Sequence, residues 1–230
     1  MSSSLFTKLS TLGVMAMIPT LVFASSALPG KTDPKTIEKQ LSSGNARFIS
    51  SKPTAKNFII SRKPLINSQS PVATVITCSD SRVAPELVFD QDLGRLFVVR
   101  VAGNVIDAST LGSIEYGVNH LRTPLLIILG HQSCGAVSAA IEYKLNNQRF
   151  EDNINAILEK MLPAVSRAQL KAQSNSNLTN VAIQENIRQT YLDIMAKSPT
   201  LKKQIEDKKV KVILAEYYLD SGKVVPVSLN

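Results

Sequence analysis

Short apolar runs alternate with amphipathic stretches along the centre of the chain. Apolar runs of about seven residues are typical of buried strands, and three are present: 71–77, 95–101 and 124–130. From about Thr110, apolar residues recur every three or four positions, which predicts a helix with one buried face: Leu111, Ile114, Val118 and Leu121. A second helix is expected from about Ser133. This alternation predicts a mostly parallel sheet flanked by helices on both faces.

The two ends of this pattern add a helix and a hairpin. Asp33 is a typical N-cap, Pro34 suits the first helical position and Gly44 is a typical stop, so we expect an N-terminal helical arm of about two to three turns. After two further helices, joined by a polar loop at 172–180, residues 209–229 predict a strand, a turn and a last strand. The fold class is therefore α/β, with about four parallel strands plus a C-terminal strand.

The first 24 residues have the pattern of a secretory signal peptide. Lys8 is their only charge, an apolar stretch follows at 12–23, and small residues suitable for cleavage come next. A retained membrane anchor is the alternative, but Pro19 interrupts the stretch, which is shorter than the roughly 20 residues of a spanning helix. We expect cleavage after residue 24, or as late as residue 27, and a single periplasmic domain at 25–230.

The charge and composition of the chain favour no particular function. The chain has 230 residues, of which 44% are hydrophobic and 19% charged, as in an ordinary globular domain. The formal net charge is +8, but Lys and Arg are scattered, and there is no Trp to stack on bases. We therefore expect a solvated basic surface that binds no nucleic acid and, once the signal peptide is removed, no membrane.

The only two cysteines lie at the ends of predicted strands. Cys78 follows the first apolar run, and Cys134 lies three residues after His131, at the start of a predicted helix whose free amides favour a thiolate. In parallel sheets the ligand site lies beyond the carboxyl ends of the strands, so these residues should meet. Two thiolates and an imidazole can hold a tetrahedral zinc ion and leave its fourth position open, as in catalytic sites.

A disulfide is the other interpretation of the cysteines. An even number of cysteines in an exported protein often forms disulfides, so Cys78 could pair with Cys134. Asp80 and Arg82 would then be an ion pair at a strand end, and His131 a core histidine. The metal site is favoured, because a disulfide needs none of these polar neighbours.

The motifs around both cysteines resemble those of one enzyme family. CSDSR at 78–82, followed by HQSC at 131–134 and then Gly135, is similar to the β class of carbonic anhydrases. The resemblance covers roughly residues 33–225 and includes five further stretches: SGNARF at 43–48, SQSP at 68–71, LFVVRVAGN at 96–104, SIEYGVNHL at 113–121 and YYLDSGKV at 217–224.

The resemblance implies an enzyme with one Zn²⁺ per chain that interconverts carbon dioxide and bicarbonate, through attack of zinc-bound hydroxide. It implies zinc ligands at Cys78, His131 and Cys134, and a catalytic pair of Asp80 and Arg82. It also implies four residues at the substrate: Gln69, Phe97, Tyr116 and Gly135. Gln69 would reach in from a neighbouring subunit of a homodimer or homotetramer, and the two aromatic residues would line an apolar pocket.

Two departures from the family pattern concern the substrate pocket and its regulation. Ala102 stands where a small branched residue is usual, which implies a slightly roomier pocket. Without Trp, the chain cannot build the regulatory bicarbonate site of one branch of the family.

Two alternative functions stay open. The same metal site could act on carbon disulfide or carbonyl sulfide, which are also linear electrophiles. Alternatively, the protein could be a non-catalytic secreted protein with a disulfide.

Overall fold

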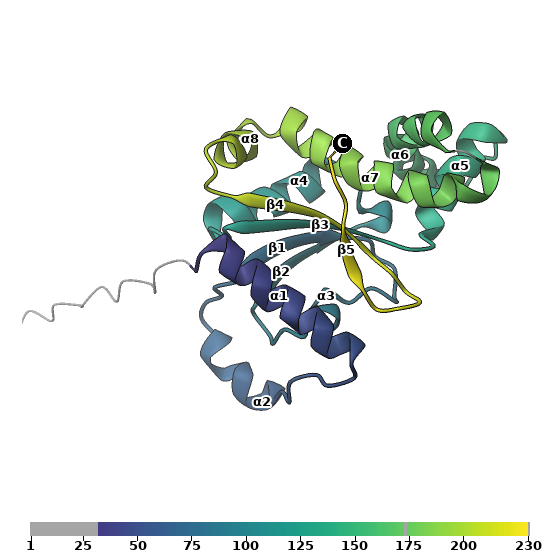
Figure 1. The fold of residues 1–230 in the computed structure, drawn as a ribbon. Coiled ribbons are helices and arrows are strands. Elements are labelled where there is room, and N and C mark those ends of the chain that lie inside the picture. The colour runs from purple at the N-terminus through teal and green to yellow at the C-terminus, as the bar shows by residue number, and fades with distance from the viewer. Residues whose placement is uncertain (1–31, 173, 230) are drawn as a thin grey trace, which may run out of the picture. The chain divides into compact units, whose positions relative to one another are not determined.

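The computed structural model describes residues 32–172 and 174–229, which fold around one five-stranded sheet. Its strands are β1 (Ala73–Thr77), β2 (Leu96–Arg100), β3 (Leu125–His131), β4 (Lys211–Tyr217) and β5 (Val224–Pro226). They are arranged in the order β2-β1-β3-β4-β5; the first four are parallel and β5 pairs antiparallel with β4 (Figure 1). The predicted α/β sheet and its C-terminal hairpin are confirmed.

Helices cover both faces of the sheet (Figure 1). On one face, α4 (Ala108–Glu115) and α7 (Asn175–Lys197) contact the strands, and α5 (Gly135–Leu145), α6 (Asp152–Lys171) and α8 (Pro199–Glu206) pack against α7. The other carries α1 (Pro34–Ile49) and α3 (Pro85–Val88). The short elements are α2 (Phe58–Ser61), η1 (Lys63–Leu65), η2 (Ala102–Asn104) and η3 (Tyr116–His120), of which η3 is a π-helical turn.

Each face of the sheet has its own apolar core. In β3, Leu126 and Ile128 contribute to the core under α4–α8, whereas Ile127 and Leu129 contribute to the core under α1. Every residue of β1 and β3 is buried. This double burial explains why these strands are continuous apolar runs in the sequence and show no alternation with polar residues.

The strand order changes direction between β1 and β3. The chain leaves β1 for β2 on one side and later returns to place β3 on the other side of β1. The connections after β1 and after β3 therefore leave the sheet in opposite directions, and the carboxyl ends of these two strands are the usual ligand position in such sheets. Cys78 and His131 lie at these two strand ends.

Helix α1 begins as predicted but continues beyond Gly44. The Asp33 side chain accepts a hydrogen bond from the Thr36 N–H at 3.2 Å and caps the first turn. The prediction that Gly44 ends the helix is wrong: a Cβ at this position would lie 1.8 Å from the Phe89 carbonyl oxygen. Glycine therefore allows the middle of α1 to pack closely against the residues that follow α3.

Two other expectations near the C-terminal half need correction. The polar stretch 172–180 is largely not a loop, because α7 already begins at Asn175. Three helices, not two, lie between α5 and β4, because Ser198 ends α7 and caps α8 by accepting the Leu201 N–H.

The expected signal peptide at 1–24 lies outside the described residues. Among the helices of residues 32–172 and 174–229, none is both long and apolar enough to cross a membrane.

Candidate metal centre

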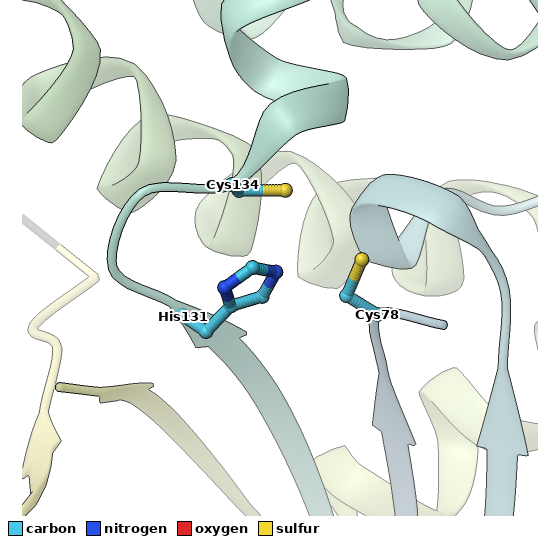
Figure 2. Close-up of side chains that lie close together, drawn as sticks. All are labelled: Cys78, His131 and Cys134. Atoms are coloured by element: carbon cyan, nitrogen blue, oxygen red, sulfur yellow. The ribbon is translucent and has the colours of Figure 1, made fainter. Parts of the chain in front are cut away.

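The three residues expected to bind zinc converge beyond the ends of β1 and β3. Cys78 follows β1, His131 is the last residue of β3, and Cys134 precedes the first turn of α5. All three are buried, and their ligand atoms lie within 4.8 Å of one another. Figure 2 shows the imidazole and both thiols directed toward one common space. Both cysteines are free thiols in this structure, so the arrangement is that of a metal site.

His131 is oriented with one ring nitrogen free for a metal. Its Nδ1 lies 2.9 Å from the backbone carbonyl oxygen of Gln132, which can only accept, so Nδ1 carries the proton. Nε2 therefore presents its lone pair. Among the described residues, it is the one buried side-chain nitrogen or oxygen without a hydrogen-bond partner. A buried acceptor left unpaired beside two sulfur atoms fits a bound cation.

One of the two thiols loses its proton readily, whereas the other holds its proton tightly. The pKa of Cys78 is lowered, mainly because the Cys134 thiol donates a hydrogen bond to its sulfur. The backbone N–H of Gly103, 3.3 Å from the same sulfur, adds to this effect. The pKa of Cys134 is raised by its bond to Cys78 and by burial. A second negative charge in this buried space needs a cation, and Zn²⁺ supplies it while accepting both thiolates.

Asp80 and Arg82 form a two-point ion pair at the rim of the cluster. Arg82 donates from Nε to Oδ1 of Asp80 at 2.9 Å and from Nη2 to Oδ2 at 2.7 Å. These bonds are the main reason why the pKa of Asp80 is well below its usual range. Oδ2 of Asp80 lies 3.8 Å from Nε2 of His131, so a carboxylate with a lowered pKa lies beside the metal position.

Arg100 fixes the backbone of the same loop and was missed by the sequence analysis. Its Nε donates to the Cys78 carbonyl at 3.1 Å, and its Nη2 donates to the Asp80 carbonyl at 2.7 Å. A charged residue at the end of the otherwise apolar β2 was the available signal. Because β2 neighbours β1, such a side chain reaches the loop that follows β1.

Two buried polar residues of α7 hold the loop that faces Cys78, and they too were missed. Asn186 donates from Nδ2 to the Gly103 carbonyl at 2.7 Å. Thr190 donates to the Asn104 carbonyl at 2.8 Å and accepts from the Asn104 side chain at 3.0 Å. Gly103 and Asn104 have φ values of 66° and 45°, so the loop needs these bonds to keep its left-handed conformation and aim the Gly103 N–H at sulfur.

One chain brings only part of the expected substrate site together. Gly135 is exposed at the first turn of α5, next to Cys134. Phe97 and Tyr116 contact each other, with ring centroids 5.9 Å apart, but Phe97 pairs in register with Thr74. That places it about 13 Å from Cys78 along the sheet, at about 3.3 Å per residue.

Gln69 is likewise separate from the cluster within this chain. It is exposed, and it precedes β1, whereas Cys78 follows the same strand at the other end. The metal cluster, Asp80, Arg82 and Gly135 are thus assembled by one chain, whereas the three remaining expected substrate residues lie elsewhere on it.

Known proteins match this chain over most of its length. The family model described as carbonic anhydrase matches residues 73–224. Carbonic anhydrase 2 of Mycobacterium tuberculosis is 36% identical over 195 residues, which cover 84% of this chain and 93% of that protein. The carbonic anhydrase of Mycolicibacterium smegmatis is 34% identical over 194 residues, with 84% and 93% covered.

A solved structure has the same fold at lower identity. A tetrameric β-carbonic anhydrase of Sordaria macrospora superposes with a TM-score of 0.64 at 21% identity, over 84% of this chain and 98% of that one. The family model and the mycobacterial relatives establish the relationship that the motifs indicated, and this superposition agrees with it in fold. The chain therefore belongs to the carbonic anhydrase family, in its β class.

Proposed function

We propose that this chain catalyses the reversible hydration of carbon dioxide to bicarbonate and a proton, with one zinc ion bound by Cys78, His131 and Cys134. The observation that carries the proposal is the convergence of three buried ligand atoms within 4.8 Å, with Nε2 of His131 left without a partner. When bound, zinc acidifies a water molecule so that a nucleophile exists near neutral pH.

The chain's own residues bind and orient the reactants. Two thiolates cancel the double charge of the ion, so we expect its water to be less acidic than in a site with three neutral histidines, and activity to rise toward alkaline pH. Asp80, kept ionised by Arg82, accepts a hydrogen bond from the nucleophile and directs its lone pair toward carbon dioxide. The first turn of α5, which begins at the exposed Gly135, is a helix N-terminus and therefore favours the product anion.

A homodimer completes the substrate pocket in this proposal. Support comes from the residues that one chain leaves apart from the metal cluster, namely Gln69, Phe97 and Tyr116. It also comes from an exposed apolar segment before β1, defined by Phe58, Ile59, Ile60 and Ile66, whose residues are 50–78% exposed. A second copy would cover this segment and bring its own substrate residues to the metal cluster. A tetramer, as in the Sordaria macrospora protein, would pair two such dimers.

We also propose that the protein is exported to the periplasm after removal of residues 1–24. The single charge at Lys8 and the apolar stretch at 12–23 support this. Bound zinc would protect the two thiolates from oxidation in that compartment.

The test uses the mature chain, stripped of metal and reloaded with zinc. We expect one zinc per chain and carbon dioxide hydration that returns in proportion to bound zinc. Carbonyl sulfide and carbon disulfide are assayed in parallel, and turnover of these alone would reassign the substrate. A chain without free thiols that takes up no zinc would contradict the metal site and support a disulfide.

A further inference from the structure

His131 takes its orientation from the residue that follows it. The Nδ1–H of the imidazole donates to the Gln132 carbonyl at 2.9 Å. Because the proton is on Nδ1, Nε2 is unprotonated and has no hydrogen-bond partner beside the two thiols. The carbonyl belongs to the first residue beyond β3, which ends at His131. Whatever holds the Gln132 peptide therefore also holds the imidazole.

Gln132 is held by the last hairpin of the sheet. Its N–H donates to the Tyr217 carbonyl at 2.8 Å, at the end of β4. Its side chain makes two bonds to Asp220, a residue 88 positions away: Nε2 donates to Oδ2 at 3.0 Å, and Oε1 accepts the Asp220 N–H at 3.2 Å. The side-chain amide of Gln132 thus hydrogen-bonds both the side chain and the backbone N–H of Asp220.

The turn that carries Asp220 is itself well anchored. Gly222 closes it with φ of 72° and donates its N–H to the Tyr218 carbonyl at 2.8 Å. Asn45 of α1 donates to the Gly222 carbonyl at 2.8 Å and accepts the Val224 N–H at 3.1 Å. Because α1 and the hairpin hold this turn, Asp220 is a fixed support for Gln132.

We propose that Gln132 and Asp220 are positioning residues for His131. The pair fixes the Gln132 peptide, and through its carbonyl it holds the imidazole in the tautomer and orientation that direct Nε2 at the metal position. This gives a role to the turn of the terminal YYLDSGKV stretch, which the sequence analysis left without one. The inference rests on the proposed zinc site, because the metal is what Nε2 would bind.

The expected effect is on metal retention. Partners that orient a metal-binding histidine typically change metal affinity by 10–100-fold. Gln132 is partly buried and Asp220 is exposed, so water can replace part of the lost bonding. We therefore expect an effect at the lower end, about tenfold in the rate of zinc release.

An exchange of the amide and the carboxylate between the two positions provides the test. Gln132→Glu removes the amide donor and opposes two carboxylates, so zinc transfer from the loaded protein to a chelator should become about tenfold faster. Adding Asp220→Asn to the same chain supplies an amide donor from the other side and should return the rate to within about twofold of the unaltered protein. Asp220→Ala, which removes one of the two bonds, should give an intermediate rate and provides a second route if Gln132→Glu folds poorly.

A matched control is available at the opposite end of the sheet. Gln204 of α8 donates from its side-chain amide to the side-chain oxygen of Asn119, 85 positions away. Gln204→Glu makes the same chemical change in an exposed bond between distant segments and should leave zinc release unchanged. Melting temperature is measured for every variant, so that a general loss of stability is separated from a local effect.

The tautomer provides a readout that needs no activity. The chain has only two histidines, so long-range proton–nitrogen spectra of ¹⁵N-labelled protein can assign both rings. We expect a single Nδ1–H tautomer of His131 in the unaltered protein and in the double variant, and a mixture in Gln132→Glu. Zinc release at the unaltered rate in Gln132→Glu, or no recovery in the double variant, would overturn this inference alone. An unaltered chain that binds no zinc would overturn the proposed function.

Discussion

The Arg82 guanidinium binds both carboxylate oxygens of Asp80, at 2.9 Å and 2.7 Å, and its Nη2 also donates to the Ser133 carbonyl at 3.3 Å. One side chain thereby links the loop after β1 to the loop after β3, at the carboxyl ends of these two neighbouring strands. The carboxylate is directed at Arg82 and remains 3.8 Å from the imidazole. This arrangement keeps a charged acceptor beside the metal position.

Asp80→Asn should separate metal binding from turnover. The variant keeps the shape of the side chain but loses the charge that accepts the nucleophile's proton. We expect unchanged zinc content and a turnover lower by roughly 10²–10⁴-fold, the usual contribution of a positioned general base. Zinc is quantified on the same sample that is assayed. Near-normal turnover at full zinc occupancy would rule out the role given to Asp80.

Asn186→Ala should loosen the loop that faces Cys78. The change leaves the buried Gly103 carbonyl without its donor, so the free energy of unfolding should fall by about 1–3 kcal/mol. Zinc release should also accelerate, because the Gly103 N–H no longer points stably at the sulfur. Ser198→Ala is the control: it removes a buried hydroxyl that bonds Glu115 near α8 and should lower stability without changing zinc release. Equal effects of both variants on zinc would contradict the link.

Glu216→Gln should make the protein more stable at neutral and alkaline pH. Of the three buried acidic residues in the described part of the chain, Asp90 and Glu185 have basic partners, whereas Glu216 has only Gln184 and Tyr218. Burial raises the pKa of Glu216.

The sign of the pH dependence follows from this raised pKa. The protonated form is favoured on folding, so its contribution is complete below the unfolded pKa of about 4.3 and is lost as pH rises through the folded value. The melting temperature of the variant should exceed that of the unaltered protein above this window, by roughly 2–4 °C for each kcal/mol, and should match it near pH 4. A constant difference at all pH values would contradict the assignment.

Ile60→Glu should dissociate the proposed dimer. Ile60 is 62% exposed in the single chain, so a charge there does not disturb folding but opposes burial of the apolar segment against a second copy. Sedimentation velocity should show monomers, and activity should fall with dissociation if the partner completes the pocket. Leu170→Glu, at an 89% exposed position on α6, is the control that should leave the assembly intact. A dimer of unchanged stability in Ile60→Glu would exclude this surface.

The metal cluster could be predicted from the sequence because its geometry follows from topology. Parallel strands end at one edge, so residues after β1 and β3 meet there whatever the details of the loops. The prediction that Gly44 ends the helix was wrong because this glycine is needed for close packing against the Phe89 carbonyl, and Phe89 is distant in sequence. The roles of Asn186 and Gln132 could not be predicted, because their partners lie 83 and 88 positions away. Nothing local in the sequence distinguishes Asn186 from other polar residues, and the position of Gln132 in the HQSC motif does not indicate that its partner is Asp220.

The most direct test of the account is stopped-flow carbon dioxide hydration as a function of pH, on the mature protein with its zinc quantified. The account predicts one zinc per chain and a rate that rises from neutral to alkaline pH, because two thiolates make the zinc water less acidic than three histidines would. Absence of hydration at every pH, with zinc bound by the chain, would contradict it.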